Sequence, residues 1–227
     1  NKISWIKGSD YKIRLSAASS GYQSVLPLSL ITRFLSDLVL DNANKEDLSI
    51  KEKKQIEKEV NKVMNDKSLT DGVKFAMLRN ISSRFKYSCF VNIVEEMELN
   101  LYPESQRSVL FDLLSYANKI ELNRLVLTTH SPYVINYLTL AAKAFLLTQK
   151  ISANETLQER VKEVVPADSA IDPARLRIYE LKDGGVFRLS TYEGLPSDEN
   201  FLNIQLGVTN ELFDQLLEIE QEFDYKN

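Results

Sequence analysis

Several features that would mark a class of protein are missing from this chain of 227 residues. The single cysteine, Cys89, cannot form an internal disulfide, so we expect a reducing, cytoplasmic location and a small buried residue rather than a reactive thiol. The 28 lysines and arginines against 32 acidic residues leave a net charge of -4, which excludes nucleic-acid binding driven by overall charge. These counts leave a local basic patch open.

Long hydrophobic runs and targeting segments are missing as well. No apolar stretch approaches the roughly 18 residues that span a bilayer, and residues 1–6 lack the charged and apolar regions of a signal peptide, so no membrane partner is expected. The glycine-rich phosphate loop G-x-x-x-x-G-K-[ST] is also absent, because Gly8 is followed by Ser9-Asp10-Tyr11-Lys12. The chain opens without methionine in a strand-like pattern, and we expect it to be part of a longer polypeptide.

The residues that are present predict an α/β protein with a parallel sheet. With 44% hydrophobic residues the chain can bury a full core. Residues 1–15 predict strands around a turn at Gly8-Ser9-Asp10, and the apolar spacing of residues 23–40 predicts a helix with Pro27 in its first turn.

Residues 41–86 are rich in Lys and Glu and open with the capping box Ser49-x-x-Glu52. They predict an insertion of two helices joined near residues 68–71. The even alternation in residues 51–62 favours a solvated face over one that contacts DNA.

A strand, helix, strand, helix order follows. Residues 87–94 form an apolar run that suits a central strand covered on both faces, and residues 124–129 form a second buried strand. Helices are predicted to start at Pro103 and, with Ser131 as N-cap, at Pro132. This order predicts a parallel βαβ unit with a right-handed crossover. The tail predicts a hairpin around Asp183-Gly184-Gly185 and a final amphipathic helix, so residues 1–150 form the main lobe and 151–227 an α+β extension on the same core.

Candidate chemistry gathers where the two central strands end. Glu95 and Glu96 follow the first strand, and His130, the one histidine of the chain, follows the second. Ligands of open α/β sheets bind at the carboxyl ends of the strands. Two adjacent carboxylates can serve a metal's water shell and an attacking water. A glutamate pair or a lone histidine is more often structural, but their matched positions favour a functional site.

Three segments in this order resemble motifs of ABC-type ATPases, particularly those with SMC-like, RecF-like and OLD-type heads. Residues 19–23 (SSGYQ) are similar to the signature motif, residues 93–106 (IVEEMELNLYPESQ) resemble the Walker B and D-loop region, and residues 127–132 (LTTHSP) resemble the H-loop. The resemblance covers roughly residues 10–150. It implies the C-terminal lobe of a P-loop NTPase-like fold, with a helical insertion at 41–86 and a small C-terminal hairpin plus helix.

The resemblance assigns roles to individual residues. Glu96 matches the general base that orients the attacking water, Glu95 the carboxylate that supports Mg²⁺, and His130 the residue that contacts the γ-phosphate of ATP. The remaining matches are nucleotide-binding positions at a dimer interface: Ser19, Ser20, Gly21 and Gln23 of the signature, and Asn100 of the D-loop. Their partner is implied to be a second ATPase subunit, in a homodimer.

Three departures from the family pattern stand out. Met97 replaces the usual proline, Tyr22 occupies a position where Glu is frequent, and the Walker A loop, which supplies most of the phosphate cradle, is absent. The chain alone is therefore predicted neither to bind ATP tightly nor to hydrolyse it. We expect the Walker A lobe to lie upstream of Asn1.

The leading hypothesis is the C-terminal part of an ATP-driven, dimerising ATPase in DNA repair, DNA maintenance or phage defence, acting beside a nuclease and DNA. The DNA connection rests on family analogy alone. A degenerate ABC-like scaffold without hydrolysis is the alternative, although such a module has no evident use for Glu96 and His130. A transporter ATPase subunit fits residues 97–103 less well. A nuclease within the chain is not favoured, because the acids after residue 150, such as Asp168, fall in turns and helix starts.

Overall fold

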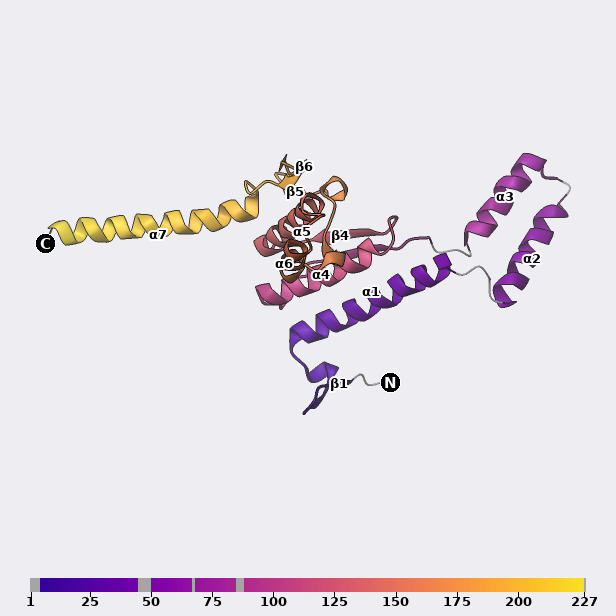
Figure 1. The fold of residues 1–227 in the computed structure, drawn as a ribbon, viewed down its shortest axis with the longest axis horizontal. Helices are drawn as coiled ribbons and strands as arrows, with labels where there is room; N and C mark the ends of the chain where they lie inside the picture. The colour runs from indigo at the N-terminus through magenta and orange to yellow at the C-terminus, as the bar shows by residue number, and fades with distance from the viewer. Residues whose placement is uncertain (1–4, 45–49, 67, 85–87, 227) are drawn as a thin grey trace.

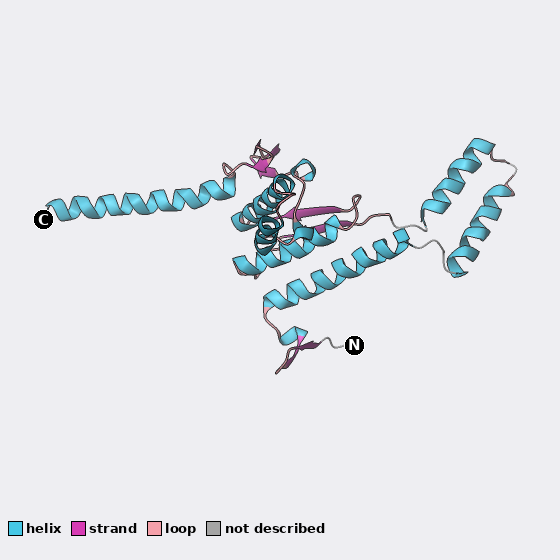
Figure 2. Cartoon of the chain, in the orientation of Figure 1, coloured by secondary structure: helices cyan, strands magenta, loops and turns pink. Residues whose placement is uncertain are grey.

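The computed structural model describes residues 5–44, 50–66, 68–84 and 88–226, which form a mixed α/β chain dominated by helices (Figures 1 and 2). In chain order the strands are β1 (Trp5–Lys7), β2 (Lys12–Arg14), β3 (Val91–Glu95), β4 (Arg124–Thr128), β5 (Tyr179–Lys182), β6 (Gly185–Arg188), β7 (Thr191–Tyr192) and β8 (Leu195–Pro196). The helices are α1 (Ser20–Asn44), α2 (Ile50–Met64), α3 (Asp71–Arg84), α4 (Pro103–Asn118), α5 (Pro132–Lys150), α6 (Glu155–Val164) and α7 (Phe201–Lys226), with 3-10 turns at Leu15–Ala17, Ala167–Ser169 and Pro173–Arg175.

The centre of the molecule is the parallel pair β3 and β4, connected through α4. Val91 lies opposite Arg124, and the register continues to Glu95 opposite Thr128. Pro103 and Pro132 stand at the first helical positions of α4 and α5, where the missing proline N–H is not needed. The predicted order of strand, helix, strand and helix, and the parallel pairing, are confirmed.

The two faces of this strand pair differ in what covers them. Side chains alternate along a strand, so Val94 and Leu127 share one face, where Val94 is buried and Leu127 packs against the core. On the other face Val91 is 58% exposed and Ile93 is 68% exposed. The prediction of a strand covered on both faces is therefore wrong for the described residues of the run 87–94: no described element lies over this second face. Residue 87 itself lies outside the described residues.

The core lies between the covered face of the strands and helices α4 and α5. Leu110 of α4 and Val134 of α5 are fully buried, as is Ala141 about two turns further along α5. The segment after α6 adds Val165 to this cluster. Burying a leucine or valine side chain contributes about 1.5–3 kcal/mol, so this cluster is the main source of stability for the elements that carry the strand ends.

Helix α1 packs against α4 with an unusually polar inward surface. Thr32 and Ser36 are buried, and the Thr32 hydroxyl accepts a hydrogen bond of 3.1 Å from the Asn92 side chain of β3. The helix begins at Ser20, so the expected place of Pro27 in its first turn is wrong: Pro27 lies inside the helix. The reason is that residues 20–22, read as a loop, already adopt helical geometry.

The outward surface of α1 is apolar, with Leu30, Ile31 and Phe34 all more than half exposed. Contrary to the expectation from the sequence, residues Ser20–Asp41 are long and apolar enough to cross a membrane by length and composition. Helices that pack within a protein can have the same length and apolar composition, and α1 packs on α4. The expectation that the chain has no membrane partner is therefore not supported by this helix.

The segment predicted as an insertion is a hairpin of two helices, α2 and α3, which Figure 1 shows set apart from the central body. Val63 of α2 and Ile81 of α3 are buried, while the lysines of α2 are exposed, as predicted for a solvated face. The predicted pair of helices is confirmed. Ser49, the first residue of the predicted capping box, lies outside the described residues.

The C-terminal part contains the predicted hairpin. β5 and β6 pair antiparallel around Asp183 and Gly184, whose φ angles of 50° and 73° are the positive values that a two-residue hairpin turn requires. α6 was not predicted from the sequence. The final helix α7 is confirmed, and its apolar side chains are exposed along most of its length.

The carboxyl of Asp112 on α4 gives a pH-dependent test of this packing. Desolvation, reinforced by the negative charge of Asp168, raises the pKa of Asp112 above its ordinary value of 3.8. A pKa raised by folding favours the protonated form, so stability is lost as the pH rises through the folded-state pKa. We predict that Asp112→Asn raises the melting temperature at pH 7 and has little effect near pH 3, as measured by circular dichroism.

The exposed Asp214 of α7 offers a matched control, and Asp214→Asn should leave the melting temperature unchanged at both pH values. An Asp112→Asn variant that is equally stabilised at pH 3 and pH 7 would contradict the proposed origin of the effect.

Candidate functional site

The site lies where β3 and β4 end side by side. Glu95 and Thr128 are opposite each other in the register, so the residues that follow, Glu96 and Thr129–His130, leave the sheet at the same edge. The backbone N–H of Glu96 donates to the Thr128 carbonyl at 3.0 Å and approaches the Thr128 hydroxyl at 3.2 Å. These bonds extend the ladder by one residue and fix where the Glu96 side chain starts.

Glu96 and His130, predicted from the sequence as a functional pair, lie next to each other. The Nε2 atom of His130 is 3.5 Å from Oε1 of Glu96. The His130 side chain is 83% exposed and that of Glu96 is 41% exposed, so both open to solvent. A carboxylate and an imidazole this close to each other can accept a proton from, and donate a hydrogen bond to, one ligand that contacts both side chains.

The loop from Glu96 to Asn100 has a constrained backbone. Glu96 has a φ of 46° and Asn100 a φ of 61°, both in the left-handed region. Asparagine adopts this region readily, but glutamate does so at a cost of about 1–2 kcal/mol. Two loop bonds of 3.0 Å hold the conformation, from Leu99 N to Glu96 O and from Leu101 N to Glu98 O. A strained glutamate at a strand end is typical of residues kept for their side-chain chemistry.

Glu98 joins this loop to the segment that carries His130. Its Oε1 atom accepts a hydrogen bond of 2.6 Å from the backbone N–H of His130. Its Oε2 atom is buried and has no hydrogen-bond partner among the described residues. The carboxylate therefore sets the position of the His130 backbone, and through it the separation between Glu96 and the imidazole.

A second link runs through Gln106 of α4. The buried Ser131 hydroxyl donates to Gln106 Oε1 at 2.7 Å, and the Gln106 amide donates to the Leu101 carbonyl at 3.0 Å. Ser131 stands at the predicted N-cap position of α5, but its side chain makes this bond and not a capping bond. Met97, which stands where the family pattern has proline, packs with 5% exposure in the core.

Sequence reasoning missed the positioning roles of Glu98 and Gln106. Both stand inside the segment that carries the family resemblance, but the hydrogen bonds that reveal their roles join residues 32 and 25 positions apart in the chain. An acidic residue two positions after the predicted base was the one available signal for Glu98.

The signature-like segment lies against the same loop. A side-chain carbon at Gly21 would come within 2.8 Å of the Asn100 carbonyl, so only glycine fits there. The Gln23 side chain donates to the Ala18 carbonyl at 2.8 Å, which ties the start of α1 to the preceding turn. Ser19 and Ser20 are exposed at this helix start. The structure thus brings Gly21 and Asn100 together, and uses the Gln23 side chain for local structure.

Glu95, predicted to support Mg²⁺, is placed apart from Glu96 by strand alternation. It is exposed and belongs to the same face as Val91 and Ile93. Among the described residues no group of three or more His, Cys, Asp or Glu side chains could hold a metal. One carboxylate fits Mg²⁺ that arrives with phosphate oxygens, because this ion keeps several waters and needs only one or two protein carboxylates.

A cavity of about 390 Å³ lies elsewhere, beside α5 and α6. Phe145, Gln149 and Lys162 are among its lining residues, and none of the predicted site residues is. The cavity therefore adds no support to the site at the strand ends.

Comparisons with protein-family models, with curated proteins and with solved structures gave no match for this chain. The assignment of the site therefore depends on its residues and their geometry.

Glu98 provides a test of how the site is held together. We predict that Glu98→Ala lowers the free energy of unfolding by about 1–3 kcal/mol, because the His130 N–H loses a charge-assisted acceptor. Glu98→Gln keeps an acceptor and should cost less. Denaturant unfolding measures both.

The control is Glu104→Ala on α4, which removes a surface ion pair of 3.6 Å with Arg107 and should change stability by less than about 1 kcal/mol. Equal effects of Glu98→Ala and Glu104→Ala would show that the bond to His130 does not hold the loop.

Because the backbone at Glu96 is strained, we predict that one substitution there raises the free energy of unfolding. Glycine adopts a φ of 46° without the penalty that a side chain brings, so Glu96→Gly should raise the free energy of unfolding by roughly 0.5–1 kcal/mol. The companion variant Glu95→Gly, in the extended β3 strand, should lower it. A destabilised Glu96→Gly protein would argue against strain at this residue.

Proposed function

We propose that this chain is the C-terminal portion of an ABC/SMC-like ATPase that binds and hydrolyses ATP and dimerises on ATP. The observation that carries the proposal is the Glu96 and His130 pair, 3.5 Å apart at the ends of adjacent parallel strands. Open parallel sheets bind their ligands at this edge. Glu96 also adopts a φ of 46°, a left-handed backbone conformation that costs a glutamate about 1–2 kcal/mol.

In this proposal the two side chains have complementary roles. Glu96 accepts the proton of a water whose oxygen attacks the γ-phosphorus of ATP, while the bond from that phosphorus to the β,γ-bridging oxygen breaks and ADP leaves. His130, held at its backbone by Glu98, donates a hydrogen bond to a γ-phosphate oxygen. Mg²⁺ supplies charge neutralisation on the phosphates, and Glu95 would hold its water shell.

Two surfaces of the chain suit the other components of such a site, the Walker A lobe and the nucleotide of a second subunit. The uncovered face with Val91 and Ile93, more than half exposed, fits a nucleotide-binding lobe that carries the Walker A loop. Ser19, Ser20 and Gly21 start a helix of 25 residues, and the first N–H groups of a helix suit an anion such as a phosphate. In the proposed dimer this helix start faces the nucleotide of the second subunit, with Asn100 beside it.

The process driven by hydrolysis is proposed by family analogy only. DNA repair, DNA maintenance or phage defence, with a nuclease as partner and in the cytoplasm, is the setting that the resemblance implies. The second candidate, a scaffold without hydrolysis, is favoured by one observation: the described chain contains no phosphate loop.

The decisive variant is Glu96→Gln in the full-length gene product. Loss of the proton acceptor should lower ATP turnover by about 10²–10⁴-fold and leave ATP binding intact. Trapped ATP should then stabilise the dimer, which light scattering detects as a doubling of the molar mass.

Glu104→Gln, on the exposed surface of α4, is the matched control and should leave turnover unchanged. Turnover that survives Glu96→Gln would remove Glu96 from the role of base. A full-length protein that binds no ATP would favour the scaffold instead.

A further inference from the structure

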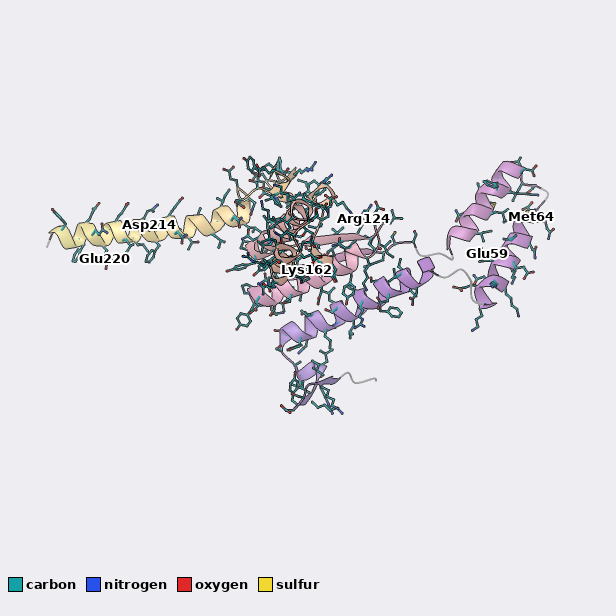
Figure 3. All side chains as sticks on the ribbon, in the orientation of Figure 1. Glu59, Met64, Arg124, Lys162, Asp214 and Glu220 are labelled. Atoms are coloured by element: carbon teal, nitrogen blue, oxygen red, sulfur yellow. The ribbon has the colours of Figure 1, made fainter. Side chains whose placement is uncertain are left out.

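The final helix, α7, leaves the body of the protein. Its N-terminus is anchored, since the Phe201 N–H donates to Glu180 Oε1 at 2.6 Å and the Asn203 side chain approaches that of Asn136 at 3.3 Å. Beyond this anchor Figure 1 shows the helix extending away from the other elements, and Figure 3 places Asp214 and Glu220 on the extended part.

The extended part exposes large apolar side chains. Leu212 is 55% exposed, Leu216 is 64% exposed and Ile219 is 65% exposed. A helix without packing is only marginally stable in water, because most helical stability in proteins comes from burying an apolar face. The sequence of α7 therefore calls for a partner surface along this side.

The apolar spacing fits another helix as that partner. Leu212, Leu216, Ile219 and Phe223 follow one another at steps of four, three and four residues, and the same spacing continues towards the anchor through the polar Thr209 and Gln205 to Leu202. This 3.5-residue repeat, here called the α7 seam, is the a/d pattern of coiled coils, and residues 202–223 contain three such heptads.

The charges of α7 fit a second copy of itself in the parallel direction. Three acids, Glu211, Asp214 and Glu218, occupy positions that point away from the seam. The flanking e and g positions pair Val208 with Phe213 of the second copy, and Gln215 with Glu220, so no like charges meet. An antiparallel arrangement centred on the seam would set Glu220 against Leu206 and desolvate a carboxylate.

We propose that this protein self-associates through the α7 seam, with copies of α7 parallel to each other and without any need for nucleotide. This interface goes beyond the proposed ATP-dependent dimer, which uses the helix start at Ser19–Gly21. Association holds two sets of strand-end sites near one another before ATP binds.

The test is sedimentation or light scattering of the full chain in nucleotide-free buffer at micromolar concentrations. The wild-type protein is expected to be larger than a monomer. The double variant Leu212→Glu/Leu216→Glu should weaken association at least about 100-fold, since burial of each leucine accounts for about tenfold or more in an equilibrium constant. Higher salt should leave wild-type association unchanged or strengthen it, because the outer face is acidic.

Leu217→Glu makes the same chemical change on α7 outside the seam and should leave the assembly intact. The direction is tested by Gln205→Cys in a Cys89→Ser background: oxidation should cross-link parallel copies, whereas Glu211→Cys should not cross-link. Because Leu212 and Leu216 are exposed, the body should keep its melting temperature in every variant.

A monomeric wild-type protein, or a mass unaffected by Leu212→Glu/Leu216→Glu, would overturn the proposal. Association that weakens in salt would indicate a partner of opposite charge and would also overturn it. Since no ATP is present, none of these results depends on whether the strand-end site hydrolyses nucleotide.

Discussion

The parallel pairing of β3 with β4 is the constraint on which the rest of the site depends. The register that sets Glu95 opposite Thr128 makes both strands end at the same level, and the next residues bring a carboxylate and an imidazole to 3.5 Å. An antiparallel pairing, or a shift by one residue, would send these side chains to opposite ends or faces. The buried contacts of α4 and α5 hold this register in place.

Around the strand ends, hydrogen bonds offset two unfavourable features of the loop. Glu96 adopts a left-handed backbone, and one carboxylate oxygen of Glu98 is buried without a partner among the described residues. The bonds from Glu98 to the His130 backbone and from Gln106 to Leu101 restrain the two loops relative to each other. The Glu96 and His130 side chains thus start from restrained loops and remain open to solvent, an arrangement suited to binding a ligand from solvent.

Much of the local structure could be predicted from the sequence, because it depends on short-range patterns. The strand before Glu95, the helix starting at Pro103 and the hairpin turn at Asp183 follow from hydrophobic runs, proline and glycine. The exposure of Val91 and Ile93 could not be predicted. Apolar residues predict that a strand face is buried, but they do not identify the element that buries it. The role of Glu98 could not be predicted, because it depends on a hydrogen bond to a residue 32 positions away in the chain. The apolar stripe of α7 was visible in the sequence, but its exposure was not.

A structure of the full-length protein with Mg²⁺ and a non-hydrolysable ATP analogue would test the roles of Glu96 and His130. We expect the γ-phosphate within hydrogen-bonding distance of the His130 imidazole, with an ordered water between the terminal phosphorus and the Glu96 carboxylate. A nucleotide bound away from the ends of β3 and β4, or a Glu96 side chain turned away from the phosphate, would contradict it.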